Sequence, residues 1–312
     1  MAGFDIIGDV HGHSAKLTAL LQQMGYRHHM GAWRHPDRSA IFVGDLIDRG
    51  PGQLETIRIV REMVDAGTAQ AVLGNHEFNA IAWFMPDPES DGEHLRRRTT
   101  GNLEQHEAFL REAGHDSELH AELVGWFLTL PLWLELPGLR VVHACWDPRQ
   151  LDAISGSLRP GRMLTPATVV AGSRRGSIEY RAIETLIKGP EVALPAGHAF
   201  VDKGGKQRVD IRIRWWDAGA DTYRKAGILG SAEQEAQLPD MPITQAKQNG
   251  YPDAIPVFFG HYWLTGRPKP LTPHAACVDY GAGIDGPLVA YRWDGESTLL
   301  QSSFLSTNWL GT

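Results

Sequence analysis

Cysteine is scarce in this chain, and an excess of basic charge is missing. Only Cys145 and Cys277 occur among 312 residues, so we expect no disulfide framework and a reducing compartment. Lys and Arg total 30 against 37 Asp and Glu, and this net charge of −7 argues against general nucleic-acid binding. We also find no secretory signal pattern and no apolar run long enough to cross a bilayer. We therefore expect a cytoplasmic globular protein without a membrane partner.

Strand and helix patterns alternate in the first part of the chain. A short apolar run ends at Gly8, and Leu17, Leu20 and Leu21 follow at helical spacing. The same order recurs over residues 39–67, and a third strand pattern begins at residue 69. This alternation predicts an α/β fold. Near the end of the chain, we expect closing antiparallel strands in the segments 275–281, 287–295 and 297–304.

Two polar stretches interrupt this pattern. We interpret residues around 86–117 as an insertion or cap, and residues around 218–251 as a loop excursion, within a single domain spanning 1–312. The basic run from Leu95 to Thr100 is interpreted as a solvated face of the insertion. The alternative is an electropositive rim that recruits a polyphosphate or a phosphopeptide.

Polar side chains follow five expected strands, each time at the carboxyl end. The carboxyl ends of strands are where sites collect in open α/β sheets. Each motif alone could be a turn, a helix cap or a buried structural histidine, but five in order are harder to explain by structure alone. The residues are Asp9, His11, Asp45, Asp48, Asn75, His76, His143 and His261.

Oxygen and imidazole donors without a thiolate suit two divalent metal ions, with manganese or iron favoured and zinc also allowed. Such a pair would acidify a shared water that acts as the nucleophile. His198 also follows a glycine and competes with His261 as the last ligand. One metal could be held by Asp9, His11 and a bridging Asp45, and the other by Asp45, Asn75, His143 and His261.

Three further side chains have catalytic chemistry. His76 would be the general acid for the leaving oxygen, and Asp48 would fix its tautomer and raise its basicity. Arg49 has a planar guanidinium that suits phosphoryl oxygens. We expect Arg49, Asn75 and His76 to contact the substrate phosphate.

The motifs Gly-Asp-Val-His-Gly-His, Gly-Asp-Leu-Ile-Asp-Arg-Gly, Gly-Asn-His-Glu, Val-Val-His-Ala and Phe-Phe-Gly-His occur in this order. The set resembles the calcineurin-like metallophosphoesterases, and within them the phosphoprotein-phosphatase branch that includes bacterial symmetrical diadenosine tetraphosphatases. The similarity runs from Asp5 to about Trp293. It implies a four-layer sandwich of two mixed β-sheets flanked by helices, a two-metal site and phosphoester hydrolysis.

Departures from the family pattern narrow the expected substrate. Trp263 stands where much of the superfamily has a second ligand histidine, and Leu73 replaces an arginine typical of eukaryotic Ser/Thr phosphatases. We therefore expect a hydrolase of phosphomonoesters or nucleotide phosphoanhydrides of the dinucleoside polyphosphate type. A Ser/Thr or dual-specificity protein phosphatase is the alternative, and a catalytically silent phosphate-binding protein is a third possibility. Cys145 could be a redox-sensitive thiol or an inert buried one, and at least one of Trp215 and Trp216 should lie in the core.

Overall fold

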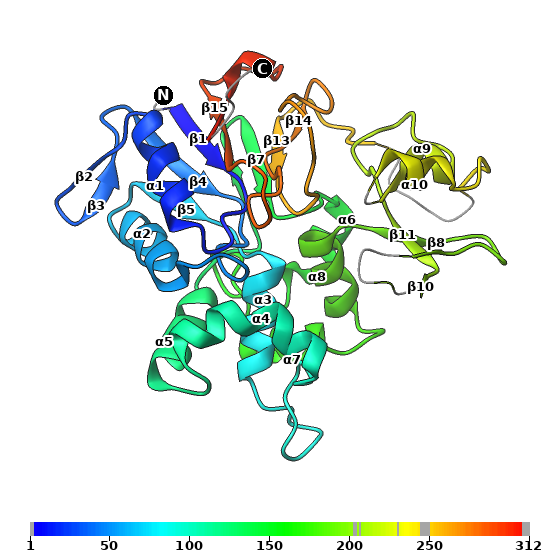
Figure 1. The fold of residues 1–312 in the computed structure, drawn as a ribbon, viewed down its shortest axis with the longest axis horizontal. Coiled ribbons are helices and arrows are strands. Elements are labelled where there is room, and N and C mark those ends of the chain that lie inside the picture. Colours follow the sequence, from blue (N-terminus) through cyan, green and yellow to red (C-terminus); the bar gives the residue numbers. More distant parts are fainter. Residues whose placement is uncertain (1–2, 202–204, 206, 230, 244–249, 308–312) are drawn as a thin grey trace.

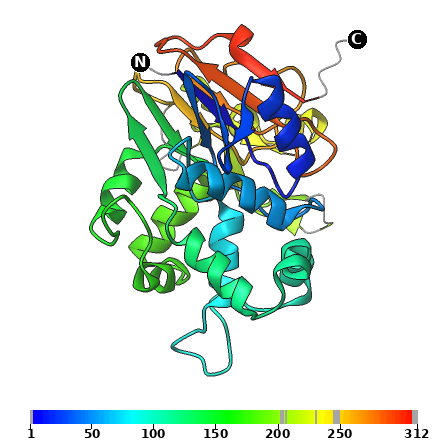
Figure 2. The same ribbon diagram turned by 90° about the vertical axis from the view of Figure 1, so that its left-hand side faces the viewer.

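The structure is a computed structural model that describes residues 3–201, 205, 207–229, 231–243 and 250–307. The ends of the domain expected over 1–312, and parts of the excursion expected at 218–251, lie outside these residues. Two β-sheets stand side by side in the upper half of Figure 1, and helices gather around and below them, as Figure 2 also shows.

The first sheet has five strands in the order β16-β15-β1-β4-β5. Strands β1 (Gly3–Ile7), β4 (Arg38–Phe42) and β5 (Ala69–Ala71) pair in parallel. Strand β15 (Val289–Trp293) pairs antiparallel with β1 on one side and with β16 (Phe304–Ser306) on the other. Helices α1 (Ser14–Gln23) and α2 (Gln53–Asp65) connect the parallel strands. Because Ile7 pairs with Phe42, the segments after β1 and β4 emerge at the same edge.

The second sheet has the order β14-β13-β7-β6. Its strands are β6 (Trp133–Leu136), β7 (Leu139–Val142), β13 (Val257–Phe259) and β14 (Ala275–Cys277). The expectation of antiparallel closing strands is wrong for 275–281, because β14 runs parallel to β13. A strand that is buried on both faces has no alternation of apolar and polar residues, so its sequence does not indicate the direction of the neighbouring strand. Most of 297–304 forms a loop and the 3-10 helix Gln301–Ser303, before β16.

Alternate residues of the strands face two different layers. Ile6 and Ile41 point between the sheets and pack with Val141 and Phe258 of the second sheet. Their neighbours face outward onto the helices, as Ile7 does. Helices α1 and α2 cover the first sheet, and α6 (Pro148–Ser155) and α8 (Ile178–Lys188) cover the second. This is the four-layer α/β sandwich implied by the sequence resemblance.

The lower part of Figure 1 contains α3 (Asn75–Phe84), α4 (Thr100–Ala113), α5 (Glu118–Phe127) and α7 (Pro166–Gly172). Helix α4 occupies the second half of the polar 86–117 segment. It turns four side chains inward at helical spacing, namely His106, Phe109, Leu110 and Ala113. In the basic run, the guanidinium of Arg98 pairs with Asp116, and that of Arg96 donates to Asn79 and Gln105.

A smaller part projects to the right in Figure 1. It contains β8 (Glu191–Ala193), β11 (Asp210–Ile213), β12 (Gly227–Ile228), α9 (Tyr223–Ala226) and α10 (Ala232–Ala236), around its own apolar cluster. Two short pairs complete the strands, β9 (Phe200–Val201) with β10 (Gln207–Arg208), and β2 (Arg27–His29) with β3 (Ala32–Arg34). The 218–251 segment therefore contains short helices and a strand. Trp215 and Trp216 are both buried, as expected for at least one. Among the described helices, none combines the length and apolar character needed to cross a bilayer.

Candidate metal centre

The segments after five parallel strands converge at one edge of the two sheets. β1 is followed by Asp9 and His11, β4 by Asp45 and Asp48, and β5 by the first turn of α3. His143 and His261 follow β7 and β13. All the side chains expected at this edge from the sequence are buried, and the structure brings them together: Asp9, His11, Asp45, Asp48, Asn75, His76, His143 and His261.

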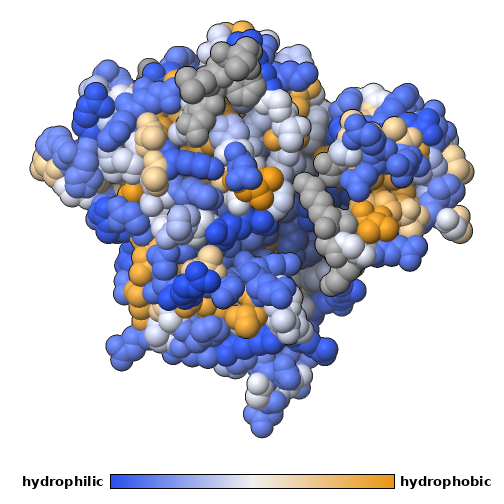
Figure 3. All heavy atoms as spheres, viewed as in Figure 1, coloured by the Kyte–Doolittle hydropathy of each residue, from blue (hydrophilic) through white to orange (hydrophobic). Residues whose placement is uncertain are grey.

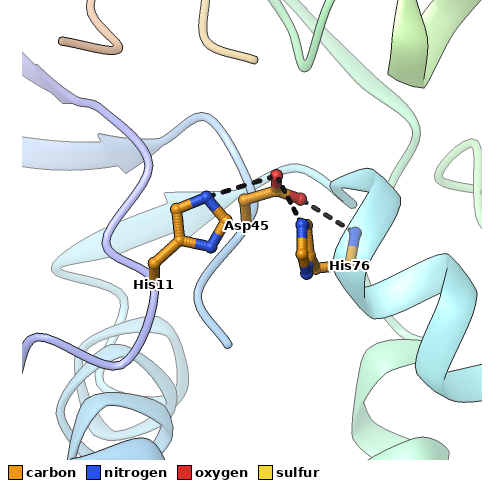
Figure 4. Close-up of side chains that lie close together, drawn as sticks. All are labelled: His11, Asp45 and His76. Carbon is orange, nitrogen blue, oxygen red and sulfur yellow. Dashed lines mark hydrogen bonds and ion pairs between the residues drawn. The ribbon is translucent and has the colours of Figure 1, made fainter. Parts of the chain in front are cut away.

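Asp45 lies at the centre of this cluster. Its Oδ2 is 3.8 Å from Nε2 of His11, 3.9 Å from Nε2 of His76 and 3.4 Å from Nε2 of His143. Figure 4 shows the carboxylate between the His11 and His76 rings. Two groups of potential ligands share Asp45, namely His11 with His76 and His143 with His261, and within each group the ligand atoms lie within 4.8 Å of one another.

Asn75 and Asp9 connect the two sheets. The Oδ1 atom of Asn75 is 3.1 Å from Nε2 of His143 and 2.7 Å from Nδ1 of His261. The backbone N–H of His261 donates to Oδ2 of Asp9 at 3.0 Å. His198, the competitor of His261 from the sequence, is instead exposed in a turn.

Buried negative charge is concentrated here. Burial, followed by the charges of Asp279 and Asp45, raises the pKa of Asp9 well above its usual value. Burial would also raise the pKa of Asp45, but the neighbouring His143 and His76 hold it well below its usual range. Burial lowers the pKa of His11 to about 3, which favours a neutral imidazole. Neutral imidazoles beside buried carboxylates are the form that binds metal ions.

Several buried polar atoms at this edge, each able to bind a metal ion, have no hydrogen-bond partner among the described residues. Among the described residues, Oδ1 of Asp9, Nε2 of His11 and Nε2 of His261 make no hydrogen bond. Buried polar atoms without a partner are costly. A divalent cation coordinated by these atoms would remove that cost, so the residues present fit a metal centre.

Asp48 carries a pair of imidazoles. Its Oδ2 contacts Nδ1 of His76, and its Oδ1 is 2.7 Å from Nδ1 of His106 on α4. Burial would raise the pKa of Asp48, but His106 and His76 lower it to about 2. Sequence reasoning missed His106, which lies in the segment interpreted as a polar insertion. Its place among the inward positions of α4 is the signal that could have identified it.

The loops that carry these residues adopt a left-handed backbone at non-glycine positions. The φ angles are 47° at His11, 50° at Asp45, 70° at Asp48, 74° at Arg49 and 74° at His261. Such residues are uncommon, and each strained backbone costs on the order of 1–3 kcal/mol. The surrounding packing and hydrogen bonds must therefore hold the loops in place.

Glu77, also missed, supplies part of this support. Its buried carboxylate accepts the backbone N–H groups of Asp45 at 2.9 Å and Gly74 at 3.0 Å on Oε2, and that of Leu46 at 2.8 Å on Oε1. The Gly74 approach is so close that a Cβ there would lie 2.3 Å from the Asp45 nitrogen. Only glycine fits at this position.

The cluster opens into a cavity of about 380 Å³. Figure 3 shows the surface hollowed between the main body and the projecting part. The guanidinium of Arg49 lies 4.1 Å from the ring centre of Trp263, a cation–π contact that sequence reasoning did not identify. The cavity is lined by Asp45, Arg49, Asn75, His76, Asn79, Gln105, Arg212, Ile228, Leu229, His261, Tyr262, Trp263, Thr265 and Ile284.

The two cysteines are not among the candidate metal ligands. Both are buried, and burial raises the pKa of the Cys145 and Cys277 thiols well above the usual value. A buried thiol with a raised pKa has little thiolate, so this environment favours the inert alternative for Cys145.

Comparisons with known proteins agree with this geometry. Residues 3–154 match the family model described as calcineurin-like phosphoesterase. The asymmetrical bis(5'-nucleosyl)-tetraphosphatase PrpE of Halalkalibacterium halodurans is 54% identical over 74 residues, 23% of this chain and 30% of that protein. The symmetrical bis(5'-nucleosyl)-tetraphosphatase of Cronobacter sakazakii is 41% identical over 80 residues, 25% of each chain. The chain thus covers less than a third of the length of these two relatives.

A solved structure supports the fold over the whole chain. It is a protein serine/threonine phosphatase from Saccharomyces cerevisiae, with a TM-score of 0.50 at 13% identity. The similarity covers 100% of this chain and 81% of that one. At this level of identity, the likeness concerns the fold alone.

Proposed function

We propose that the protein is a metal-dependent phosphoester hydrolase, because residues 3–154 match the family model described as calcineurin-like phosphoesterase. The observation that carries this proposal is the buried cluster around Asp45, with a His–Asp pair beside it and a cavity in front. The proposed substrates are phosphomonoesters or nucleotide phosphoanhydrides. Similarity to proteins named tetraphosphatases favours the dinucleoside polyphosphate type.

In the proposed metal centre, Asp45 would be a ligand of both of two divalent cations. Oxygen and imidazole donors without a thiolate favour manganese or iron, and zinc is also compatible. When bound, such cations would neutralise phosphoryl charge and lower the pKa of water at the site. We assign Asp9, His11 and Asp45 to one cation, and Asp45, Asn75, His143 and His261 to the other.

The chain's own residues would then orient the substrate and move a proton. Nδ1 of His76 is engaged by Asp48, which leaves Nε2 to donate a proton to the leaving oxygen. Stacking on Trp263 orients the Arg49 guanidinium, whose planar fork suits two phosphoryl oxygens. The Asn75 amide lines the same cavity and is proposed to contact the phosphate.

We propose that the chain is one metallophosphoesterase domain, in which both polar segments form walls of the substrate cavity. Gln105 comes from α4 in the 86–117 segment, and Ile228 and Leu229 come from the 218–251 segment. Two buried cysteine thiols are in keeping with the reducing cytoplasm, which we propose as the location.

A substrate comparison tests the proposed function. The protein reconstituted with manganese, iron or zinc is assayed on diadenosine tetraphosphate, on a phosphoserine or phosphotyrosine peptide, and on 4-nitrophenyl phosphate. We expect turnover of the aryl phosphate and a higher kcat/KM for the nucleotide than for the peptides. Preference for a peptide would make the protein a phosphatase of proteins. Absence of turnover with every metal would favour a silent phosphate-binding protein.

Two substitutions test the assigned roles. His76→Asn should lower turnover of an alkyl phosphate by about 10²–10⁴-fold with metal content retained, and an aryl phosphate should lose less because its leaving group needs less protonation. Asp45→Asn should instead lower metal content together with activity, since one charge contact to each cation is removed. Loss of metal in His76→Asn would make His76 a ligand, consistent with its place beside His11 and Asp45.

A further inference from the structure

Both carboxylate oxygens of Asp48 are occupied by imidazoles from different helices. Oδ2 contacts His76 at the start of α3, and Oδ1 is 2.7 Å from Nδ1 of His106 in the middle of α4. A carboxylate held through one oxygen can still rotate about its terminal bond. The second contact fixes the plane of the group and thereby the direction in which it holds His76.

Aromatic rings pack against the His106 side chain. The side chain is 3% exposed, its ring stacks on Phe109 at 4.9 Å, and it meets the Trp83 ring edge-on at 5.9 Å. Its Nε2 is buried and makes no hydrogen bond within the described part of the chain. Burying an imidazole with one unpartnered nitrogen is costly, and an aliphatic side chain would avoid this cost. The polar group at this position therefore serves the contact with Asp48.

A second contact ties α4 to the loop that contains Asp48. Six residues beyond His106, the carboxylate of Glu112 accepts the backbone N–H groups of Gln53 and Leu54, both at 3.0 Å. The Gln53 side chain in turn accepts the N–H of Asp48 at 2.7 Å. Helix α4 thus holds the side chain and, through Gln53, the backbone of Asp48, whose left-handed φ needs such support.

We propose that His106 is a positioning residue for the general acid, acting through Asp48 on His76. This inference rests on the proposed function, in which His76 protonates the leaving group. It assigns a role to the 86–117 segment beyond forming a wall of the cavity. Positioning by His106 would affect the rate because a proton donor must be held within a narrow range of distances and angles from the leaving oxygen.

The test compares two replacements of His106, asparagine and leucine, whose side chains have nearly the same shape as each other. In His106→Asn, the amide nitrogen can occupy the place of Nδ1 and still donate to Asp48, whereas His106→Leu has the same shape and no donor. On the metal-reconstituted full chain, we expect His106→Leu to lower kcat for an alkyl phosphate roughly 10-fold, a part of the general-acid contribution. The loss on 4-nitrophenyl phosphate should be smaller, KM should change less than twofold, and metal content should not change. His106→Asn should restore most of the alkyl-phosphate turnover.

Equal losses in the Asn and Leu variants, or equal losses on the two substrates, would overturn the positioning role. If the Leu variant does not fold, His106→Gln replaces it, because its longer side chain puts the amide nitrogen near Nε2 instead. Adding the His106 substitution to Asp48→Asn should cause little further loss, since both act through one carboxylate. A full additional loss would contradict the pathway through Asp48.

A measurement that needs no turnover separates this inference from the proposed function. In ¹⁵N-edited NMR spectra of the zinc-loaded protein, the Nδ1–H signal of His76 should shift or broaden in His106→Leu and remain near its wild-type position in His106→Asn. Unchanged spectra in both variants would refute the inference even if hydrolysis is confirmed. Altered spectra in a protein that hydrolyses no phosphate would leave the Asp48 contact established and reject the proposed function.

Discussion

Replacing Glu77 with Gln should destabilise the protein although size and shape are conserved. The Glu77 carboxylate is fully buried and accepts three backbone N–H groups, two on Oε2 and one on Oε1. A glutamine amide has one oxygen and one NH₂ group. Whichever way it is oriented, the NH₂ group faces at least one backbone N–H, and both donors then lack an acceptor.

The magnitude follows from these contacts. Each buried donor left without a partner costs about 1–3 kcal/mol. The best orientation keeps the two contacts of Oε2 and loses the one with Leu46, so two unpaired donors predict a loss of about 2–6 kcal/mol. For a chain of this size, that loss corresponds to a fall in Tm of roughly 3–9 °C.

Thermal and urea unfolding of the metal-free protein measure the effect, at a pH above the value of about 7 to which burial raises the pKa of Glu77. The matched control is Glu118→Gln, the same change in the first turn of α5 at an exposed position. It should alter stability by less than about 0.5 kcal/mol, as expected for a surface site near a helix N-terminus. If Glu77→Gln is as mild as this control, the three N–H contacts do not support the Asp45 loop.

Two further predictions concern other buried carboxylates. Asp5, in the middle of β1, pairs with Nε of Arg38 at 2.9 Å and Nε of Arg292 at 3.0 Å, so Asp5→Asn should destabilise the fold by about 3 kcal/mol and leave metal content unchanged. Unchanged urea unfolding of that variant would contradict this pairing as a source of stability. The pKa of Asp48 is about 2 in the folded protein, below that of an unfolded chain, so its charge stabilises the fold above pH ~4 and this stabilisation is lost as the pH falls toward 2. The stability difference between wild type and Asp48→Asn, measured with a chelator, should therefore shrink by about 2 kcal/mol between pH 5 and 2, and a constant difference would refute the lowered pKa.

Sequence reasoning was strongest where a strand pattern ended in a polar motif. Parallel strands with aligned ends bring such motifs to one edge, and the register of Ile7 with Phe42 does this for Asp9 and Asp45. His261 could be separated from His198 because it follows the clearer strand, and the structure brings His261 to the cluster. The ligand and catalytic roles of these residues remain predictions.

Other features depend on contacts that no local pattern contains. Strand β14 runs parallel to its neighbour β13. The sequence of a strand that is buried on both faces is equally compatible with parallel and antiparallel pairing. His106 lies within a polar helix, and its contact with Asp48 spans 58 positions of the chain. The cation–π contact of Arg49 with Trp263 likewise joins two loops distant in sequence.

The strained loops and the buried carboxylates of the site have a common physical explanation. Asp9, Asp45, Glu77 and Asp279 are all buried near one another, and their mutual repulsion contributes to the raised pKa of Asp9. Without cations, the fold must tolerate this repulsion together with left-handed backbone at Asp45. Divalent cations bound by Asp9 and Asp45 would offset this repulsion and favour the folded protein. Metal binding should therefore stabilise the very loops whose geometry costs the most.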